Sequence, residues 1–276
     1  MARRVITAIF GIPVVLAALY LGGPYWLGLM FILLVLGAVE SARLAFPDRG
    51  VLPEALGASL ALAAGVAVFA CGRDGGWPAL FAGALTVVYA AWLSREALGL
   101  GRRGKAAVPM SPERRGAGSR SPAARLLAAV YPGPFFAHLA LLRELGPPAV
   151  LLPLLVTWAT DTAAFFGGSR FGKRRLAPDI SPKKTLEGAA CGLAAGVATA
   201  ALAGAFTGGA PLAWAGIGAA VSIAAQFGDL VESGLKRKAG VKDSGALLPG
   251  HGGVLDRFDS LMMSGAVAYY LLLAAA

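Results

Sequence analysis

The chain has 276 residues, of which 57% are hydrophobic and only 14% are charged, and its mean hydropathy is +0.68. Soluble domains carry about 25% charged residues, so this composition excludes a water-soluble globule. The formal net charge of +10 is explained by basic loops on the cytoplasmic side of a membrane, and no nucleic-acid partner is needed to account for it.

Apolar runs of about 17 to 22 residues recur along the chain, and each is long enough to cross a hydrocarbon core of about 30 Å as a helix. Unbroken apolar runs favour helices, because the strands of a membrane barrel alternate lipid-facing and lumen-facing residues. The predicted fold is an all-α polytopic integral membrane protein with about nine transmembrane helices. The predicted spans lie near residues 5–21, 25–42, 54–72, 77–94, 124–142, 149–168, 188–206, 212–231 and 259–276.

Basic residues orient these spans, because positive charge accumulates in loops that stay inside. With the N-terminus inside, 23 of the 25 lysines and arginines fall in the predicted inner segments, and only Arg73 and Arg143 fall outside. We therefore expect a multi-pass protein of the cell (inner) membrane with its C-terminus outside. Soluble substrates would then reach a site on the cytoplasmic side.

The segment 99–125 is rich in Gly, Pro, Ser and Arg and lacks hydrophobic periodicity, which predicts a flexible basic cytoplasmic linker. Residues 1–98 are expected to form an N-terminal four-span scaffold. Glu40 is the clearest ionisable residue in those spans, and we expect it to reach the lipid headgroups. Residues 126–276 are expected to form a five-span catalytic region, because acidic residues lie within or at the inner ends of its spans.

The segment 161–188 places Asp161 inside a predicted span and follows it with six basic residues. Asp161 lies about eight residues, or roughly 12 Å, from the inner end of its span, so its charge needs a partner, a cation or a cavity. Lys183 and Lys184 stand just before the next span, whose N-terminus favours an acid or a bound phosphate. The alternative interpretation is that these charged residues only orient the spans in the membrane or cap a helix, and it applies above all to the arginines.

The segment 226–260 concentrates acidic and basic side chains around the last two predicted spans. Asp229 and Ser233 share one helix face, and Asp256 and Asp259 are three residues apart at the next span. Converging carboxylates repel one another unless a divalent cation lies between them, and hard oxygen ligands suit Mg²⁺ bound with substrate phosphates. The predicted metal ligands are Asp229, Asp256, Asp259 and Asp243.

Basic residues and a glycine-rich turn lie between these acids. Lys236, Arg237 and Lys242 are expected to neutralise a polyphosphate, although a positive-inside loop would have the same composition. The turn from Leu248 to Gly253 contains Gly252 and Gly253, which would let backbone amides approach an anion closely.

These residues resemble the C-terminal motif of the phosphatidate cytidylyltransferases, the CDP-diacylglycerol synthases. The upstream stretches DTAAFFGGSRFGK and SPKKTLEG are similar to another segment of the same family. The chain departs from the family pattern at Gly168-Ser169-Arg170, at Cys191 and at Phe165, and the first four spans match only in number and apolar character. The motif comprises Ser233, Lys236-Arg237, Lys242-Asp243, Gly245, Leu248 to Gly253, Asp256-Arg257 and Asp259.

The resemblance implies an enzyme of phospholipid biosynthesis that converts CTP and phosphatidic acid into CDP-diacylglycerol and pyrophosphate with Mg²⁺. It implies that Asp229 and Asp256 hold the metal. A second metal ion of unknown identity and a homodimer are both compatible with it. The predicted catalytic residues are Asp229, Asp256, Lys184 and His251. The predicted substrate-binding residues are Lys183, Lys236, Arg237, Lys242, Gly252, Gly253, Arg257, Ser233 and Asp161.

His251 is not expected to be a general base, because a phosphate monoester loses its second proton near pH 6 and is already a nucleophilic anion at neutral pH. We expect it to orient pyrophosphate or the loop. Two other functions stay open. One is a CTP-dependent transferase for a prenyl-ether lipid phosphate, and the other is an ion-coupled transporter, although the halves show no evident inverted repeat of broken spans.

Overall fold

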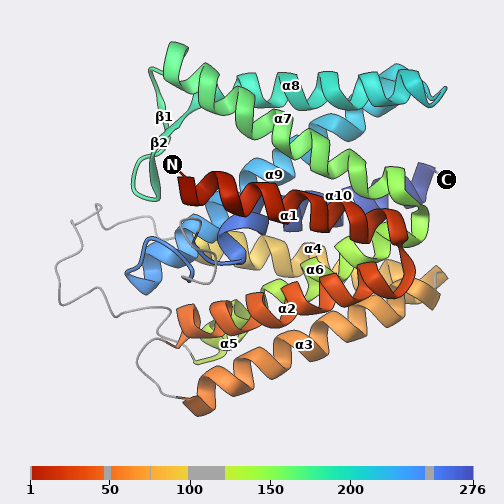
Figure 1. Ribbon diagram of the computed structural model, residues 1–276. Coiled ribbons are helices and arrows are strands. Elements are labelled where there is room, and N and C mark those ends of the chain that lie inside the picture. The colour runs from red at the N-terminus through yellow and green to blue at the C-terminus, as the bar shows by residue number, and fades with distance from the viewer. Residues whose placement is uncertain (1, 47–50, 75, 99–121, 246–251, 276) are drawn as a thin grey trace. The chain divides into compact units, whose positions relative to one another are not determined.

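The structure, a computed structural model, describes residues 2–46, 51–74, 76–98, 122–245 and 252–275 (Figure 1). The described residues are mainly helical, and the chain divides into two compact units that are each discontinuous in sequence. The first unit comprises Met1–Arg143 and Val231–Phe258, and the second comprises Glu144–Leu230 and Asp259–Ala276.

Close helix packing characterises the first unit. Helix α3 approaches α6 where a Cβ on Gly133 would collide with the backbone carbonyl of Ala61, so this approach needs a glycine. The Trp26 indole on α2 donates a hydrogen bond of 3.1 Å to the carbonyl of Leu139 on α6. The helices of this unit are α1 (Ala2–Leu21), α2 (Gly23–Ala45), α3 (Val51–Asp74), α4 (Gly76–Leu98), α5 (Pro122–Val130) and α6 (Pro132–Leu142).

The fifth predicted span is interrupted. Pro132 has no N–H for the helical hydrogen bond and its ring crowds the preceding turn, so α5 ends at Val130 and α6 begins at Pro132 after a turn at Tyr131. A 3₁₀ turn, Arg143–Leu145, follows α6.

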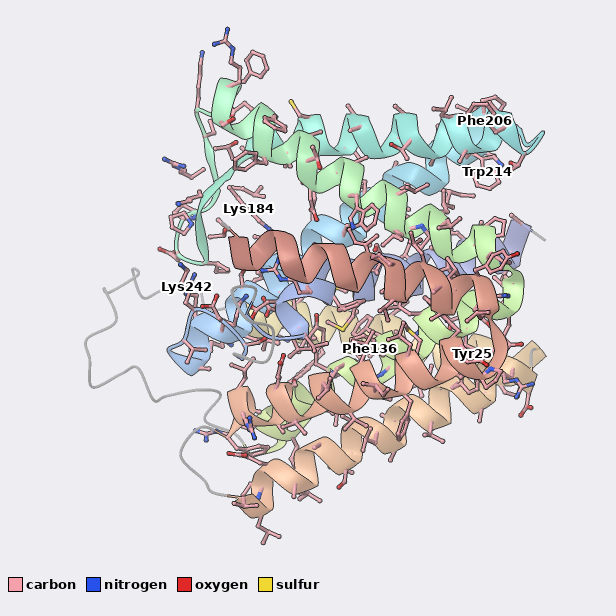
Figure 2. All side chains as sticks on the ribbon, viewed as in Figure 1. Tyr25, Phe136, Lys184, Phe206, Trp214 and Lys242 are labelled. Atoms are coloured by element: carbon pink, nitrogen blue, oxygen red, sulfur yellow. The ribbon has the colours of Figure 1, made fainter. Side chains whose placement is uncertain are left out.

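The second unit contains α7 (Pro147–Phe171) and α8 (Leu186–Phe206), which run side by side (Figure 1). A short antiparallel hairpin, β1 (Arg175–Ala177) and β2 (Ser181–Thr185), joins them. The sequence predicted no strand here. Lys184 lies at the hairpin end of this unit, and Phe206 lies at the opposite end of α8 together with Trp214 (Figure 2).

Two helices continue through both units: α9 (Pro211–Ala239) and α10 (Leu255–Ala275). Within the second unit, buried hydroxyl pairs tie them to α7. Thr160 pairs with Ser222 on α9 at 2.9 Å, and Thr157 pairs with Ser264 on α10 at 3.0 Å. Such pairs satisfy polar groups that lipid would leave without partners.

Seven helical segments of the described residues are long and apolar enough to cross a membrane. Large apolar side chains are exposed along the helices, among them Val87, Phe206 and Leu212, as expected for surfaces that face lipid. The chain is therefore an all-α polytopic membrane protein, as predicted. The seven segments are α2, α3, Arg125–Leu145, α7, α8, α9 and α10.

The predicted count of nine spans is not confirmed. Helices α1 and α4 lie at the first and fourth predicted spans, but neither is among the seven segments found over the described residues. Most of the predicted linker 99–125 lies outside the described residues. The division into a scaffold over 1–98, that linker and a catalytic region over 126–276 stays a prediction, and the compact units are divided differently.

Candidate active site

The hairpin that carries Lys184 is fixed at both of its ends. Thr185 caps α8, since its Oγ1 accepts a hydrogen bond of 3.1 Å from the Gly188 amide. Glu187, in the first turn of α8, accepts hydrogen bonds from the backbone amides of Lys173 at 3.0 Å and Arg174 at 3.2 Å. Glu187 therefore ties the residues after α7 to the start of α8.

Lys184 meets Asp229 within the second unit. Its Nζ lies 2.5 Å from Asp229 Oδ2, and the two side chains are 27% and 29% exposed. Asp161, exposed on α7, interacts electrostatically with both. We call Asp161, Lys184 and Asp229 the Lys184 cluster. It brings two acids and one lysine from α7, β2 and α9 together, which leaves an excess of negative charge.

Asp259 belongs to the same unit. Helices α9 and α10 approach closely where Gly228 faces the backbone carbonyl of Asp259. Asp229 directly follows Gly228, so Asp229 and Asp259 lie on adjoining turns of the two helices. Asp259 Oδ1 accepts a hydrogen bond of 2.6 Å from the Ser260 amide.

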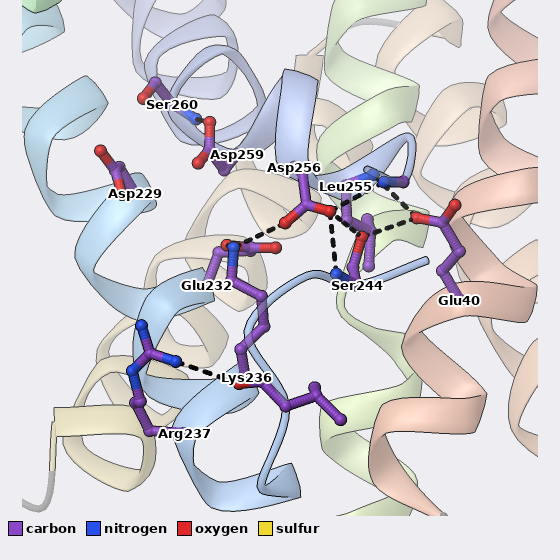
Figure 3. Close-up of polar contacts among 12 residues, drawn as sticks. Glu40, Asp229, Glu232, Lys236, Arg237, Ser244, Leu255, Asp256, Asp259 and Ser260 are labelled. Atoms are coloured by element: carbon purple, nitrogen blue, oxygen red, sulfur yellow. Dashed lines mark hydrogen bonds and ion pairs between the residues drawn. The ribbon is translucent and has the colours of Figure 1, made fainter. Parts of the chain in front are cut away.

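A second group of polar side chains lies in the first unit and surrounds Asp256 (Figure 3). Asp256 Oδ2 accepts hydrogen bonds from the amides of Ser244 and Gly253, both at 2.8 Å, and from the Ser244 hydroxyl at 3.0 Å. Its Oδ1 lies 2.6 Å from Lys236 Nζ, which also pairs with Glu232. Together with Glu40, these residues form what we call the Asp256 network.

The structure contradicts the expectation that Glu40 reaches the lipid headgroups. Glu40 is only 6% exposed. Its Oε1 accepts a hydrogen bond from the Val254 amide at 2.9 Å, and its Oε2 accepts from the Leu255 amide at 3.0 Å and from the Ser244 hydroxyl at 2.9 Å. Sequence analysis noted Glu40 only as an acid inside an apolar run and missed these contacts.

The glycines predicted to approach a substrate anion are partly engaged within the protein. Gly252 has a φ of +83°, a backbone conformation that favours glycine. The amide of Gly253 donates to Asp256, and a side chain at Gly253 would collide with Glu40 and Ser244. His251 lies outside the described residues.

The remaining predicted residues lie on or after α9 and at the start of α10. Helix α9 continues to Ala239, so Ser233, Lys236 and Arg237 are helical, although the sequence predicted that the span ends near residue 231. The Arg237 guanidinium donates a hydrogen bond of 3.1 Å to the carbonyl of Val241. The exposed predicted site residues include Lys183, Lys242, Asp243 and Arg257.

The chemistry of the two aspartates fits a magnesium ion, because Mg²⁺ is commonly held by one or two carboxylates together with water and substrate phosphates. Asp229 and Asp256 each present a carboxylate oxygen to a lysine ammonium group, so each already faces a cation. Among the described residues, no group of three or more His, Cys, Asp or Glu side chains is placed to hold a metal ion. Asp229 and Asp256 belong to different units.

The fold defines the class as an all-α polytopic membrane protein, in which Lys184 pairs with Asp229 and Lys236 pairs with Asp256. Comparison with known protein families identifies the family within this class. The chain belongs to the cytidylyltransferase family, whose sequence profile matches residues 2–275. The family resemblance predicted from the sequence motifs is thus confirmed.

Curated relatives that are named phosphatidate cytidylyltransferase include proteins from three genera of bacteria described next. That of Helicobacter pylori (strain ATCC 700392 / 26695) is 46% identical over 154 residues, covering 54% of this chain and 56% of the relative. That of Bacillus subtilis (strain 168) is 42% identical over 152 residues, covering 53% and 56%. That of Brucella suis biovar 1 (strain 1330) is 46% identical over 136 residues, covering 48% and 50%. The chain spans about half the length of the curated relatives it matches.

Proposed function

We propose that the chain is a phosphatidate cytidylyltransferase, which converts CTP and phosphatidic acid into CDP-diacylglycerol and pyrophosphate. The observation that carries the proposal is the family match over residues 2–275, together with relatives that bear this name at 42% to 46% identity. The Lys184 cluster and the Asp256 network support it, because both combine the carboxylates and ammonium groups that phosphate chemistry needs.

In the proposed reaction, a phosphate oxygen of phosphatidic acid attacks the α-phosphorus of CTP. The bond between the α-phosphorus and the bridging oxygen breaks, and pyrophosphate leaves with the electron pair. The attacking phosphate is already an anion at neutral pH, so no side chain has to remove a proton. The residues of the protein must therefore hold two anions in line and stabilise the charge of the transition state.

The residues divide between these two tasks. Asp229 and Asp256 would hold Mg²⁺, with Asp259 and Asp243 as additional ligands. The bound ion would supply charge neutralisation at the phosphates. Lys184 and Lys236 would contact phosphate oxygens, and His251 would orient pyrophosphate or its loop. The other proposed substrate contacts are Asp161, Lys183, Ser233, Arg237, Lys242, Gly252, Gly253 and Arg257.

The proposal includes a setting. Because basic residues predominate in the predicted inner segments, we place the protein in the cell (inner) membrane with the active site on the cytoplasmic side. The N-terminus is then inside and the C-terminus outside. CTP would arrive from the cytoplasm and the lipid from the bilayer.

Incubation of purified protein with α-labelled CTP, phosphatidic acid and Mg²⁺ tests the function directly. We expect a labelled lipid that forms only when all three are present, and none in excess chelator. A parallel reaction with a prenyl-ether lipid phosphate distinguishes the tail preference. The absence of any labelled lipid from phosphatidic acid under complete conditions would refute the proposal, and full turnover in chelator would refute its metal requirement.

A further inference from the structure

We infer that Glu40 is a positioning residue, which holds Asp256 in one orientation from a helix more than two hundred residues away in the sequence. The inference rests on the proposed function, in which Asp256 acts at the site. Every residue of the argument lies in the first unit.

Glu40 fixes the start of α10, the helix that carries Asp256. The first N–H groups of a helix have no partner within the helix. Glu40 supplies acceptors to two amides at this end, those of Val254 at 2.9 Å and Leu255 at 3.0 Å. A carboxylate is favoured there because the N-terminus of a helix carries partial positive charge. Glu40 on α2 therefore acts as a helix cap supplied by a distant segment.

Ser244 extends the effect to Asp256 itself. Its hydroxyl lies between the two carboxylates, 2.9 Å from Glu40 Oε2 and 3.0 Å from Asp256 Oδ2, so its single proton is shared between them. The amide of Ser244 donates to the same Asp256 oxygen at 2.8 Å. Glu40 thus contacts both Ser244, which follows α9, and the residues at the start of α10.

The contacts assign different roles to the two oxygens of Asp256. Oδ2 faces three donors, the amides of Ser244 and Gly253 and the Ser244 hydroxyl that it shares with Glu40, whereas Oδ1 faces Lys236. In the proposed function, Oδ1, which contacts Lys236 here, is the oxygen that Asp256 would present to a ligand, and the contacts of Oδ2 would set its direction. Loss of Glu40 would loosen those contacts without removing any group that touches substrate.

The backbone around Glu40 is shaped to accept its side chain. A Cβ on Gly253 would collide with the Glu40 carboxylate, and one on Gly245 would lie 2.8 Å from Glu40 Oε1. A buried carboxylate is costly unless hydrogen bonds replace its water. The three donors to Glu40 provide that replacement.

The variant Glu40→Gln tests the inference with little change of volume. An amide nitrogen replaces one carboxylate oxygen, so either the Val254 or the Leu255 amide loses its acceptor. We expect the Mg²⁺ concentration for half-maximal activity to rise about 10-fold to 100-fold, as when the partner of a metal-binding side chain is removed. The kcat should fall at least about 10-fold, with the KM for phosphatidic acid changed less than about twofold.

A matched control is Glu54→Gln, on α3. Glu54 pairs with Arg43 at 3.8 Å, and its side chain is 31% exposed. Within the described residues, its ion-pair partner is Arg43 and not a member of the Asp256 network, so we expect the wild-type Mg²⁺ dependence.

Hydrogen exchange gives a readout that needs neither Mg²⁺ nor activity. In the full-length protein without ligands, the amides of residues 252–258 should exchange at least about 10-fold faster in Glu40→Gln and at the wild-type rate in Glu54→Gln. Unchanged exchange in Glu40→Gln would overturn the inference. So would a normal kcat and Mg²⁺ dependence in that variant while the wild type is active.

If Glu40→Gln does not fold, Ser244→Ala is the variant to measure, because it removes only the hydroxyl between the two carboxylates. We expect a smaller rise in the half-maximal Mg²⁺ concentration, and an unchanged value would contradict the inference. Failure of the proposed function would look different, since the wild type itself would then form no labelled lipid. The exchange measurement would still decide whether Glu40 holds the start of α10.

Discussion

Replacing Lys184 with methionine removes an ammonium group and keeps a long side chain, which separates two roles of this lysine. One role is structural, because Lys184 Nζ lies 2.5 Å from Asp229 Oδ2. Unit charges about 4 Å apart attract by about 4 kcal/mol at an effective dielectric constant of about 20. The side chains are 27% and 29% exposed, so solvent screening reduces the expected cost to folding to about 1–2 kcal/mol.

The other role is the proposed contact with a substrate phosphate. Loss of one preorganised charge at a transition state commonly lowers the rate about 10²-fold to 10³-fold, or about 3–4 kcal/mol. We therefore expect kcat/KM for CTP to fall by that factor in Lys184→Met, a larger loss than the effect on folding.

The assay combines initial rates of labelled lipid formation with thermal unfolding of the purified protein in detergent. Lys173→Met is the control, because Lys173 is an exposed lysine of the same basic segment and its hydrogen bond to Glu187 comes from the backbone. A variant that unfolds at lower temperature but keeps kcat/KM within twofold of wild type would refute the assignment. Lys184 would then only balance the charge of the acids around it.

Three further predictions concern other parts of the chain. Asp229→Asn and Asp256→Asn should each lower turnover at least about 10³-fold while gel filtration shows a folded protein, and near-normal rates in either would contradict its proposed role. Gly192→Ala should lower the free energy of unfolding by about 1–3 kcal/mol, because the added Cβ would lie 2.8 Å from the Thr160 carbonyl on α7. The control Gly216→Ala has no neighbour within 4 Å, and an equal loss in both variants would refute the packing argument. A cysteine at Ser119, outside the described residues, should react only with reagents on the cytoplasmic side, and labelling from outside in intact cells would overturn the proposed orientation.

The helical membrane fold followed from the sequence because it depends on local composition. Lipid offers the backbone no hydrogen-bond partners, so a long apolar run has to satisfy its own amides and carbonyls as a helix. This holds for α2, α3, α7 and α8, whose predicted centres match the structure. The sequence also indicated the acids of the proposed site, such as Asp229 and Asp161, because acids are expensive within or at the inner ends of apolar spans. Their role stays a prediction.

The sequence missed features that depend on the flanks of the spans. It predicted the end of the span in α9 near residue 231, whereas the helix continues to Ala239, since charged residues such as Lys236 and Arg237 end an apolar run without ending a helix. It also predicted no hairpin between α7 and α8, because the two short strands carry too few residues for an alternating pattern to be recognised.

Only the tertiary structure decided which charged groups meet. Lys184 pairs with Asp229 and Lys236 with Asp256, although the sequence places several lysines and acids at equivalent spacings. Glu40 is the clearest case, because its partner Ser244 is 204 residues away. Local periodicity tells which face of a helix is apolar, but the partner of a buried charge is set by how distant helices pack. That packing follows from side-chain shape and close backbone approach, as at Gly133 against Ala61, and no local pattern in the sequence reports it.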